Sequence, residues 1–123
     1  MKNEKLSVME NVKNLIDEKS LILTMKERVI LPEILPQNGS KLQQILVRSL
    51  ISKIEFSQSE IQEFEIQFTQ TGINWNKRAI GRTFSWPVSA AEISILKQAS
   101  AEFDKNGKVT QFNLSLIEQI DEL

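Results

Sequence analysis

The chain has 123 residues, of which 41% are hydrophobic and 25% charged, a composition typical of one globular domain rather than a disordered chain. It contains no His, Cys or Tyr, which excludes a disulfide scaffold and removes the commonest metal ligands, thiol nucleophiles and general bases. Fifteen basic and sixteen acidic side chains give a formal net charge of −1, so no overall field draws the protein to nucleic acid or to an anionic membrane.

Apolar residues near the N-terminus recur at the spacing of one helix face, which predicts an amphipathic helix over residues 5–18. The stripe consists of Leu6, Val8, Met9, Val12, Leu15 and Ile16. A helix of this length is marginal alone and must dock, either on its own domain or on a partner or second copy. Val8, Val12 and Ile16 are therefore candidate residues for protein–protein interaction or self-association.

Residues 20–31 carry two short apolar runs separated by three charged residues, a pattern that predicts two strands or one bent strand. Pro32 and Pro36 then favour an extended path that ends in a turn at residues 37–39. Residues 32–39 are the one stretch of the sequence that indicates a boundary between two parts of the chain. It divides the chain into an N-terminal helix and strand arm, residues 1–31, and a compact α+β body, residues 32–123, within one domain overall.

Three capping boxes mark helix starts in the body, because a Ser side chain and a Glu or Gln three residues later satisfy each other's backbone N–H groups. The boxes are Ser40 with Gln43, Ser57 with Glu60, and Ser89 with Glu92. The first opens a helix of about 14 residues, the second a short helix, and the third a helix that stops at Asn106-Gly107. Thr110 is expected to cap a final helix.

Between the second and third boxes, apolar residues alternate with polar ones, which predicts strands. The first strand carries Phe64, Ile66 and Phe68, and the last carries Ile80, Phe84 and Trp86. A turn at Thr71-Gly72 leads into a short strand over residues 73–76, and the last strand is expected to end at Pro87.

Strands that cluster between helices, instead of alternating with them, predict an α+β fold. We expect a small, mainly antiparallel sheet packed against about four helices in a single domain. The expected core consists of Leu42, Ile45, Leu46, Leu50, Phe64, Ile66, Phe84, Trp86, Ile93 and Leu96.

Residues 66–91 contain no acidic side chain but hold three basic residues and both tryptophans of the chain. Basic residues interleaved with aromatic ones are typical of surfaces that bind phosphates and stack on bases. The candidate interaction residues in this window are Trp75, Lys77, Arg78 and Arg82. A hairpin whose aromatics belong to the core and whose basic residues are solvated explains the same pattern, and we favour that interpretation.

Two groups of residues with side-chain oxygens could be interpreted as metal sites, but neither has the ligand spacing that such a site requires. Glu55, Glu60, Glu63 and Glu65 lack the acidic-x-Lys spacing of magnesium nucleases, and a solvated strand face explains them. Residues 102–113 imitate part of a calcium loop, but Asn113 stands where a bidentate Glu is needed. We therefore expect no metal, no cofactor and no catalytic residues.

Several turn and cap segments resemble small proteins of unassigned function that are encoded by bacterial phages and prophages. The segments are Val29 to Gly39, Ile54 to Phe64, Trp75-Asn76 and Lys105 to Thr110, and the likeness covers residues 28–121. The resemblance implies a mobile-element setting and a small accessory role, and it carries no catalytic residues over to this chain.

These features favour a non-catalytic accessory protein that acts by protein–protein interaction, with a protein partner or by self-association. The alternative is a nucleic-acid-binding module that uses residues 66–91. An enzyme that works with carboxylates and Lys alone ranks last. The apolar runs are too short to span a membrane, and we expect a cytoplasmic protein with no membrane partner.

Overall fold

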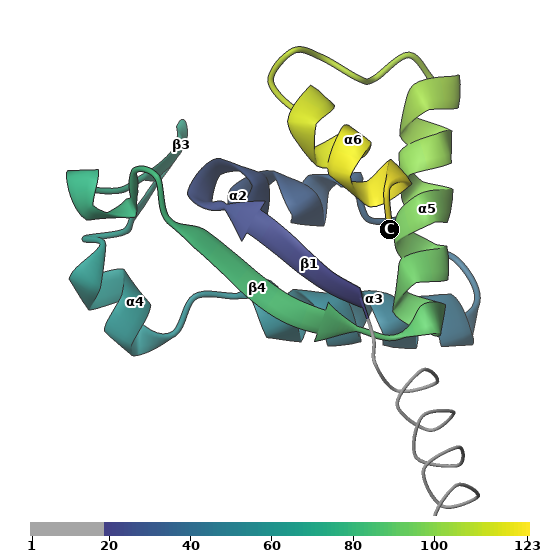
Figure 1. The fold of residues 1–123 in the computed structure, drawn as a ribbon, viewed down its shortest axis with the longest axis horizontal. Helices are drawn as coiled ribbons and strands as arrows, with labels where there is room; N and C mark the ends of the chain where they lie inside the picture. The colour runs from purple at the N-terminus through teal and green to yellow at the C-terminus, as the bar shows by residue number, and fades with distance from the viewer. Residues whose placement is uncertain (1–18) are drawn as a thin grey trace, which may run out of the picture.

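The computed structural model describes residues 19–123 of the chain. A two-stranded antiparallel ribbon crosses this part of the protein (Figure 1). Strand β1 (Lys19–Thr24) pairs along its whole length with β4 (Thr83–Val88). Leu21 and Leu23 on β1 are buried while the residues between and beside them are exposed, because successive side chains of a strand point to opposite faces. The ribbon therefore presents one apolar face to the helices.

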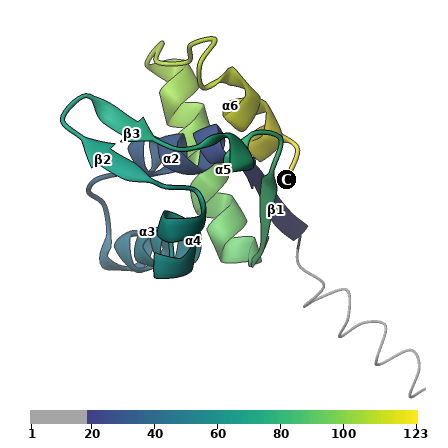
Figure 2. The ribbon, with the colours of Figure 1, turned by 90° about the vertical axis from the view of Figure 1, so that its left-hand side faces the viewer.

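The helices lie behind this ribbon and at both of its ends (Figure 1). The remaining elements are α2 (Met25–Ile34), α3 (Lys41–Ile54), α4 (Gln58–Glu63), β2 (Gln67–Thr69), β3 (Gly72–Asn74), the 3-10 turn η1 (Lys77–Ala79), α5 (Ala90–Lys105) and α6 (Leu114–Asp121). Helices α5 and α6 stand at one end of the ribbon, and α4 stands at the other (Figure 1). Strands β2 and β3 form a separate antiparallel hairpin on the side of α2 away from the ribbon (Figure 2).

Helices α2, α3, α4 and α5 each begin at a capping box in which both reciprocal hydrogen bonds are present. The pairs are Thr24 with Glu27, Ser40 with Gln43, Ser57 with Glu60, and Ser89 with Glu92. The last three confirm the predicted helix starts. The predicted stop of α5 is also confirmed, because the helix is followed by Gly107 with φ at +67°, a conformation that favours glycine.

Two apolar clusters hold the fold together. The larger joins the ribbon to α2, α3, α5 and α6, and its fully buried members include Leu31, Leu50, Leu96 and Leu116. The smaller lies under α4 and the hairpin and consists of Met25, Phe64, Ile66 and Ala79, with Phe56, Ile61, Ile73, Trp75 and Phe84 packed against it. The α4–hairpin unit thus has an apolar base of its own.

The α+β prediction is confirmed, but the segment after β1 folds differently from the prediction. Residues 25–34 form helix α2 instead of a second strand or a bent one, and Pro32 lies inside that helix. The overlooked signal is the capping box of Thr24 and Glu27. The extended path begins only at Leu35, which precedes a second proline and is therefore pushed out of the helical region. Residues 19–31 are accordingly integral to the fold, through β1 and α2.

The predicted core positions of α3 are partly wrong. Leu42 and Ile45 are exposed, whereas Val47 joins Leu50 in the core and Leu46 is half-buried. Apolar residues occupy several faces of α3, so their spacing does not settle which face turns inward. Of the other predicted core residues, Phe64, Ile66 and Leu96 are buried, and Phe84, Trp86 and Ile93 are half-buried.

Three further boundaries differ from expectation. Ile80 lies outside β4 and is largely exposed, so it does not share a buried face with Phe84 and Trp86. Strand β4 continues past Pro87 to Val88. Helix α6 begins at residue 114, not at Thr110, because Thr110 and Asn113 bind each other's backbone N–H groups in a turn just before the helix.

Candidate functional site

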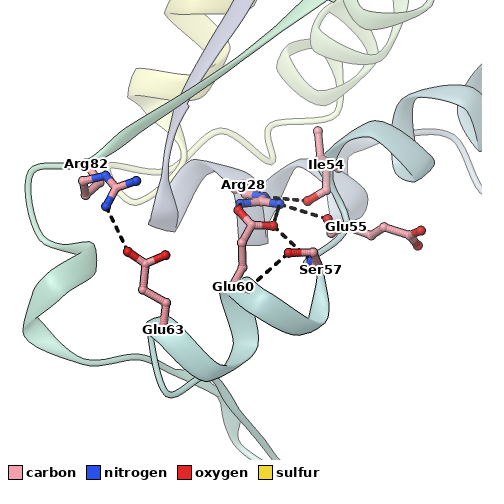
Figure 3. Close-up of polar contacts among 7 residues, drawn as sticks. All are labelled: Arg28, Ile54, Glu55, Ser57, Glu60, Glu63 and Arg82. Carbon is pink, nitrogen blue, oxygen red and sulfur yellow. Dashed lines mark hydrogen bonds and ion pairs between the residues drawn. The ribbon is translucent and has the colours of Figure 1, made fainter.

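Arg28 lies where α2, α3 and α4 meet, and its side chain is only 2% exposed. From α2 it reaches the C-terminal end of α3, where Nε donates to the Ile54 carbonyl at 2.6 Å and Nη2 to the Glu55 carbonyl at 2.9 Å. It also binds the Glu60 carboxylate of α4 through two hydrogen bonds of 2.6 and 2.8 Å (Figure 3). The last carbonyls of a helix have no partner within the helix, so Arg28 supplies from α2 the donors that α3 lacks.

Aromatic rings lie close to the guanidinium of Arg28. Its central carbon is 4.3 Å from the ring centroid of Phe56, 4.8 Å from that of Phe84 and 5.0 Å from that of Trp86. Rings at these distances attract a cation through their electron-rich faces, and a planar guanidinium suits them better than an ammonium does. Arg28 therefore joins three helices to the aromatic face of β4.

The hydrogen bonds from Arg28 are the largest influence on the pKa of Glu60, which they help to lower from 4.5 to about 2. Burial of the carboxylate opposes this shift, and the backbone N–H of Ser57, which Glu60 caps at 3.0 Å, reinforces it. Glu60 consequently stays ionised while it serves both as the cap of α4 and as the partner of Arg28.

We expect the free energy of unfolding to fall as the pH drops from about 4.5 to about 2, the range between the ordinary and the folded-state pKa of Glu60. A carboxyl with a depressed folded-state pKa stabilises the fold fully above its unfolded pKa, and this contribution is lost as the pH falls through the folded pKa. Glu60→Gln should be less stable than the parent near neutral pH and should show a smaller acid-induced loss. Urea titrations across this pH range measure both effects, and an unchanged acid dependence in the variant would contradict the assignment.

An apolar groove of about 280 Å³ opens beside Arg28, between α2, the end of α3, α4 and the β2–β3 hairpin. Its walls consist of Val29, Pro32, Ile51, Ile54, Phe56, Ile61, Phe68 and Ile73. Ile51 on α3 is 37% exposed and Phe68 on β2 is 63% exposed, so large apolar side chains at the groove meet solvent. Of the lining residues only Arg28 and Glu55 are charged, and Glu60 neutralises the first.

A second cleft, of about 500 Å³, lies between the α2–α3 connection and α5. Its lining is rich in side-chain amides, which come from Gln37, Asn38, Gln43, Gln98 and Asn106. Gln43 donates to Gln98 at 3.5 Å, so two of these amides already bind each other. Polar and apolar residues share the lining of this cleft, whereas the apolar groove exposes the kind of surface that marks an interaction site.

A further charged cluster joins α3 to α5. Glu92 accepts hydrogen bonds from Lys53 at 2.7 Å, from the hydroxyl of Ser49 at 2.9 Å and from the backbone N–H of Ser89 at 2.9 Å. Burial alone would raise the pKa of Glu92, but these hydrogen bonds together outweigh it and lower the pKa. The cluster holds the start of α5 against α3.

The window of basic and aromatic residues, 66–91, has no acidic residue in its sequence, but Glu63 lies beside it in the fold. Lys77 and Arg78 are exposed on η1, but Arg78 donates to the Glu63 carbonyl at 3.3 Å. Arg82 pairs with the Glu63 carboxylate at 3.5 Å (Figure 3), and its guanidinium lies 5.2 Å from the Phe64 ring centroid. Trp75 is half-buried against the smaller apolar cluster. The carboxylate of Glu63, which precedes the window in sequence, thus pairs with one of its cations.

The other candidate residues do not converge on a second site. Val8, Val12 and Ile16 lie outside the described residues. Within residues 19–123, no three acidic side chains form a group that could hold a metal ion. The carboxylate of Glu65 accepts from the Asn76 amide at 3.0 Å. Sequence reasoning missed both Arg28 and the apolar groove, because each arises from helices that meet only in the folded chain.

Comparisons with known proteins leave the function to be argued from this geometry. No protein-family model, curated protein or solved structure matches the chain. Within the described part of the chain, no helix is long and apolar enough to cross a membrane. The apolar groove, with Ile51 and Phe68 exposed beside it, is the feature on which a function can be built.

Proposed function

We propose that this chain is a non-catalytic accessory protein that acts by binding another protein through the apolar groove. The observation that carries the proposal is the apolar wall of the groove, with Ile51 and Phe68 exposed beside it. Exposed apolar surface of this kind marks protein interaction sites, and a groove between helices suits the apolar side chains of a partner helix. The phage-like segments agree with a small accessory role.

The charged side chains support binding over catalysis, because the buried ones are committed to structural contacts. Arg28, Glu27 and Glu92 are each at least 95% buried and hydrogen-bonded to neighbouring elements. In residues 19–123, every buried side-chain nitrogen or oxygen has a hydrogen-bond partner. Catalytic groups are typically perturbed and directed into a cleft, where they stay available to a substrate.

Nucleic-acid binding is the second candidate, and it rests on the exposed Lys77, Arg78 and Arg82. Three cations give a modest electrostatic footprint, and Glu63 already binds two of them. We therefore rank this candidate below protein binding and use it as the competing outcome of the test.

Ile51→Asp should abolish partner binding, because it places a charge at the groove that would be desolvated on binding. Chemical cross-linking in lysate, followed by sizing, should reveal a self-associated or heteromeric species of the tagged full chain that the variant lacks. Leu42→Asp is the matched control, since Leu42 lies on the same helix, is 66% exposed and does not line the groove. That variant should retain the species.

The competing outcome is measured with single-stranded DNA and RNA. We expect no affinity tighter than about 100 μM at physiological salt, the weak end of non-specific binding. Micromolar binding that falls steeply with salt, and that is lost when Lys77, Arg78 and Arg82 are neutralised together, would show that protein binding is the wrong choice.

A further inference from the structure

The start of the described chain and the apolar groove lie on opposite faces of the fold. In Figure 2 the hairpin that borders the groove stands on one side, and the beginning of β1 stands on the other. Lys19, the first residue of β1, therefore lies on the side of the domain away from the groove. This placement decides which copy of the chain can fill the groove.

Residues 1–18 lie outside the described part of the chain, and their sequence carries the apolar stripe of Leu6, Val8, Met9, Val12, Leu15 and Ile16. The stripe predicts a helix over residues 5–18, about 21 Å long, that runs directly into β1 at Lys19. Such a helix would end where β1 begins and would leave no linker to carry it around its own domain. A second molecule has no such constraint.

From these observations we infer that residues 5–18 of one chain bind the apolar groove of a second copy, and that the exchange is reciprocal. The inference deepens the proposed function and rests on it, since it names a second copy of this chain as the partner. Two identical exchanges close a symmetric dimer, in which the same pair of surfaces is used twice. Val8, Val12 and Ile16 supply the apolar side chains, and Ile51 and Phe68 receive them.

The size and chemistry of the groove suit this occupant. Its volume of about 280 Å³ lies just below the usual range for small-molecule pockets, which start at about 300 Å³. It therefore suits the side chains along one face of a helix, the mode in which amphipathic helices bind apolar grooves. Burying the groove under the apolar stripe would remove the exposed side chains of Ile51 and Phe68 from water.

Sedimentation equilibrium of the purified full chain tests the dimer. We expect Val12→Asp and Ile51→Asp each to weaken dimerisation by about tenfold or more, because each would bury an unpaired charge. Leu42→Asp should leave the dimer intact, and thermal melts of all variants confirm folding. A purified chain that stays monomeric, or a dimer that depends on Leu42 instead of Ile51, overturns the inference.

Cross-linking separates exchange between copies from docking within one copy. The chain has no Cys, so single substitutions give a clean background. Mixing Val12→Cys and Phe68→Cys chains under oxidising conditions should give a disulfide-linked heterodimer, whereas Val12→Cys mixed with Leu42→Cys should give little. A doubly substituted chain that closes on itself as a monomer overturns the inference.

The two proposals fail differently. If the purified chain is monomeric but lysate yields a heteromeric species that Ile51→Asp removes, the proposed function stands and a second copy is not the partner. If neither a dimer nor a heteromer depends on Ile51, both proposals fall.

Discussion

Arg28→Ala should lower the free energy of unfolding by about 3–5 kcal/mol, the cost of removing one partner from a buried ion pair. The substitution leaves the Ile54 and Glu55 carbonyls without the hydrogen bonds from Arg28, and it leaves the Glu60 carboxylate without its cation. It also removes the group that the aromatic rings contact. Equilibrium urea unfolding, followed by tryptophan fluorescence, measures the loss.

Arg82→Ala provides the matched comparison, because Arg82 also pairs with a glutamate of α4 and also lies near aromatic rings. Both side chains of that pair are about half exposed, so the expected loss is at most about 1 kcal/mol. Equal losses for the two substitutions would mean that burial of Arg28 contributes nothing, and the account of the helix junction would fail.

Leu50→Ala should cost about 2–5 kcal/mol, because Leu50 is fully buried in the larger cluster and its truncation leaves a cavity. Leu42→Ala on the same helix should change stability by about 0.5 kcal/mol or less, since Leu42 is mostly exposed. The same urea titration measures both variants. A larger loss at Leu42 than at Leu50 would show that α3 turns a different face toward the core from the one in the structure.

The predictable part of this fold is the part that local chemistry determines. A Ser followed three residues later by Glu or Gln located the starts of α3, α4 and α5, because the two residues need only each other to form the cap. Alternation likewise indicated that Phe84 and Trp86 share a face of β4. These signals act over a few residues, so they are visible without the rest of the molecule.

The errors arise where tertiary contacts decide between local options. Residues 25–34 contain β-branched residues and a proline, which favour a strand or a break, yet Thr24 and Glu27 cap a helix there and the core receives its apolar side. Helix α3 has apolar residues on several faces, and only contact with α5 and the ribbon selects Leu50 over Leu42. The groove was likewise unpredictable, because Ile51 and Phe68 meet across elements that are distant in sequence.

The capping glutamates have a consequence for how the domain opens. Glu27 also accepts from Ser115 of α6, Glu60 binds Arg28 of α2, and Glu92 binds Lys53 of α3. In many helices the first turn frays independently, which lets its amide hydrogens exchange through small local fluctuations. Here the first turn of α2, α4 or α5 cannot unwind without breaking a link to a distant helix. The capped amides at these starts should therefore exchange with solvent more slowly than those of a helix start that has no such link.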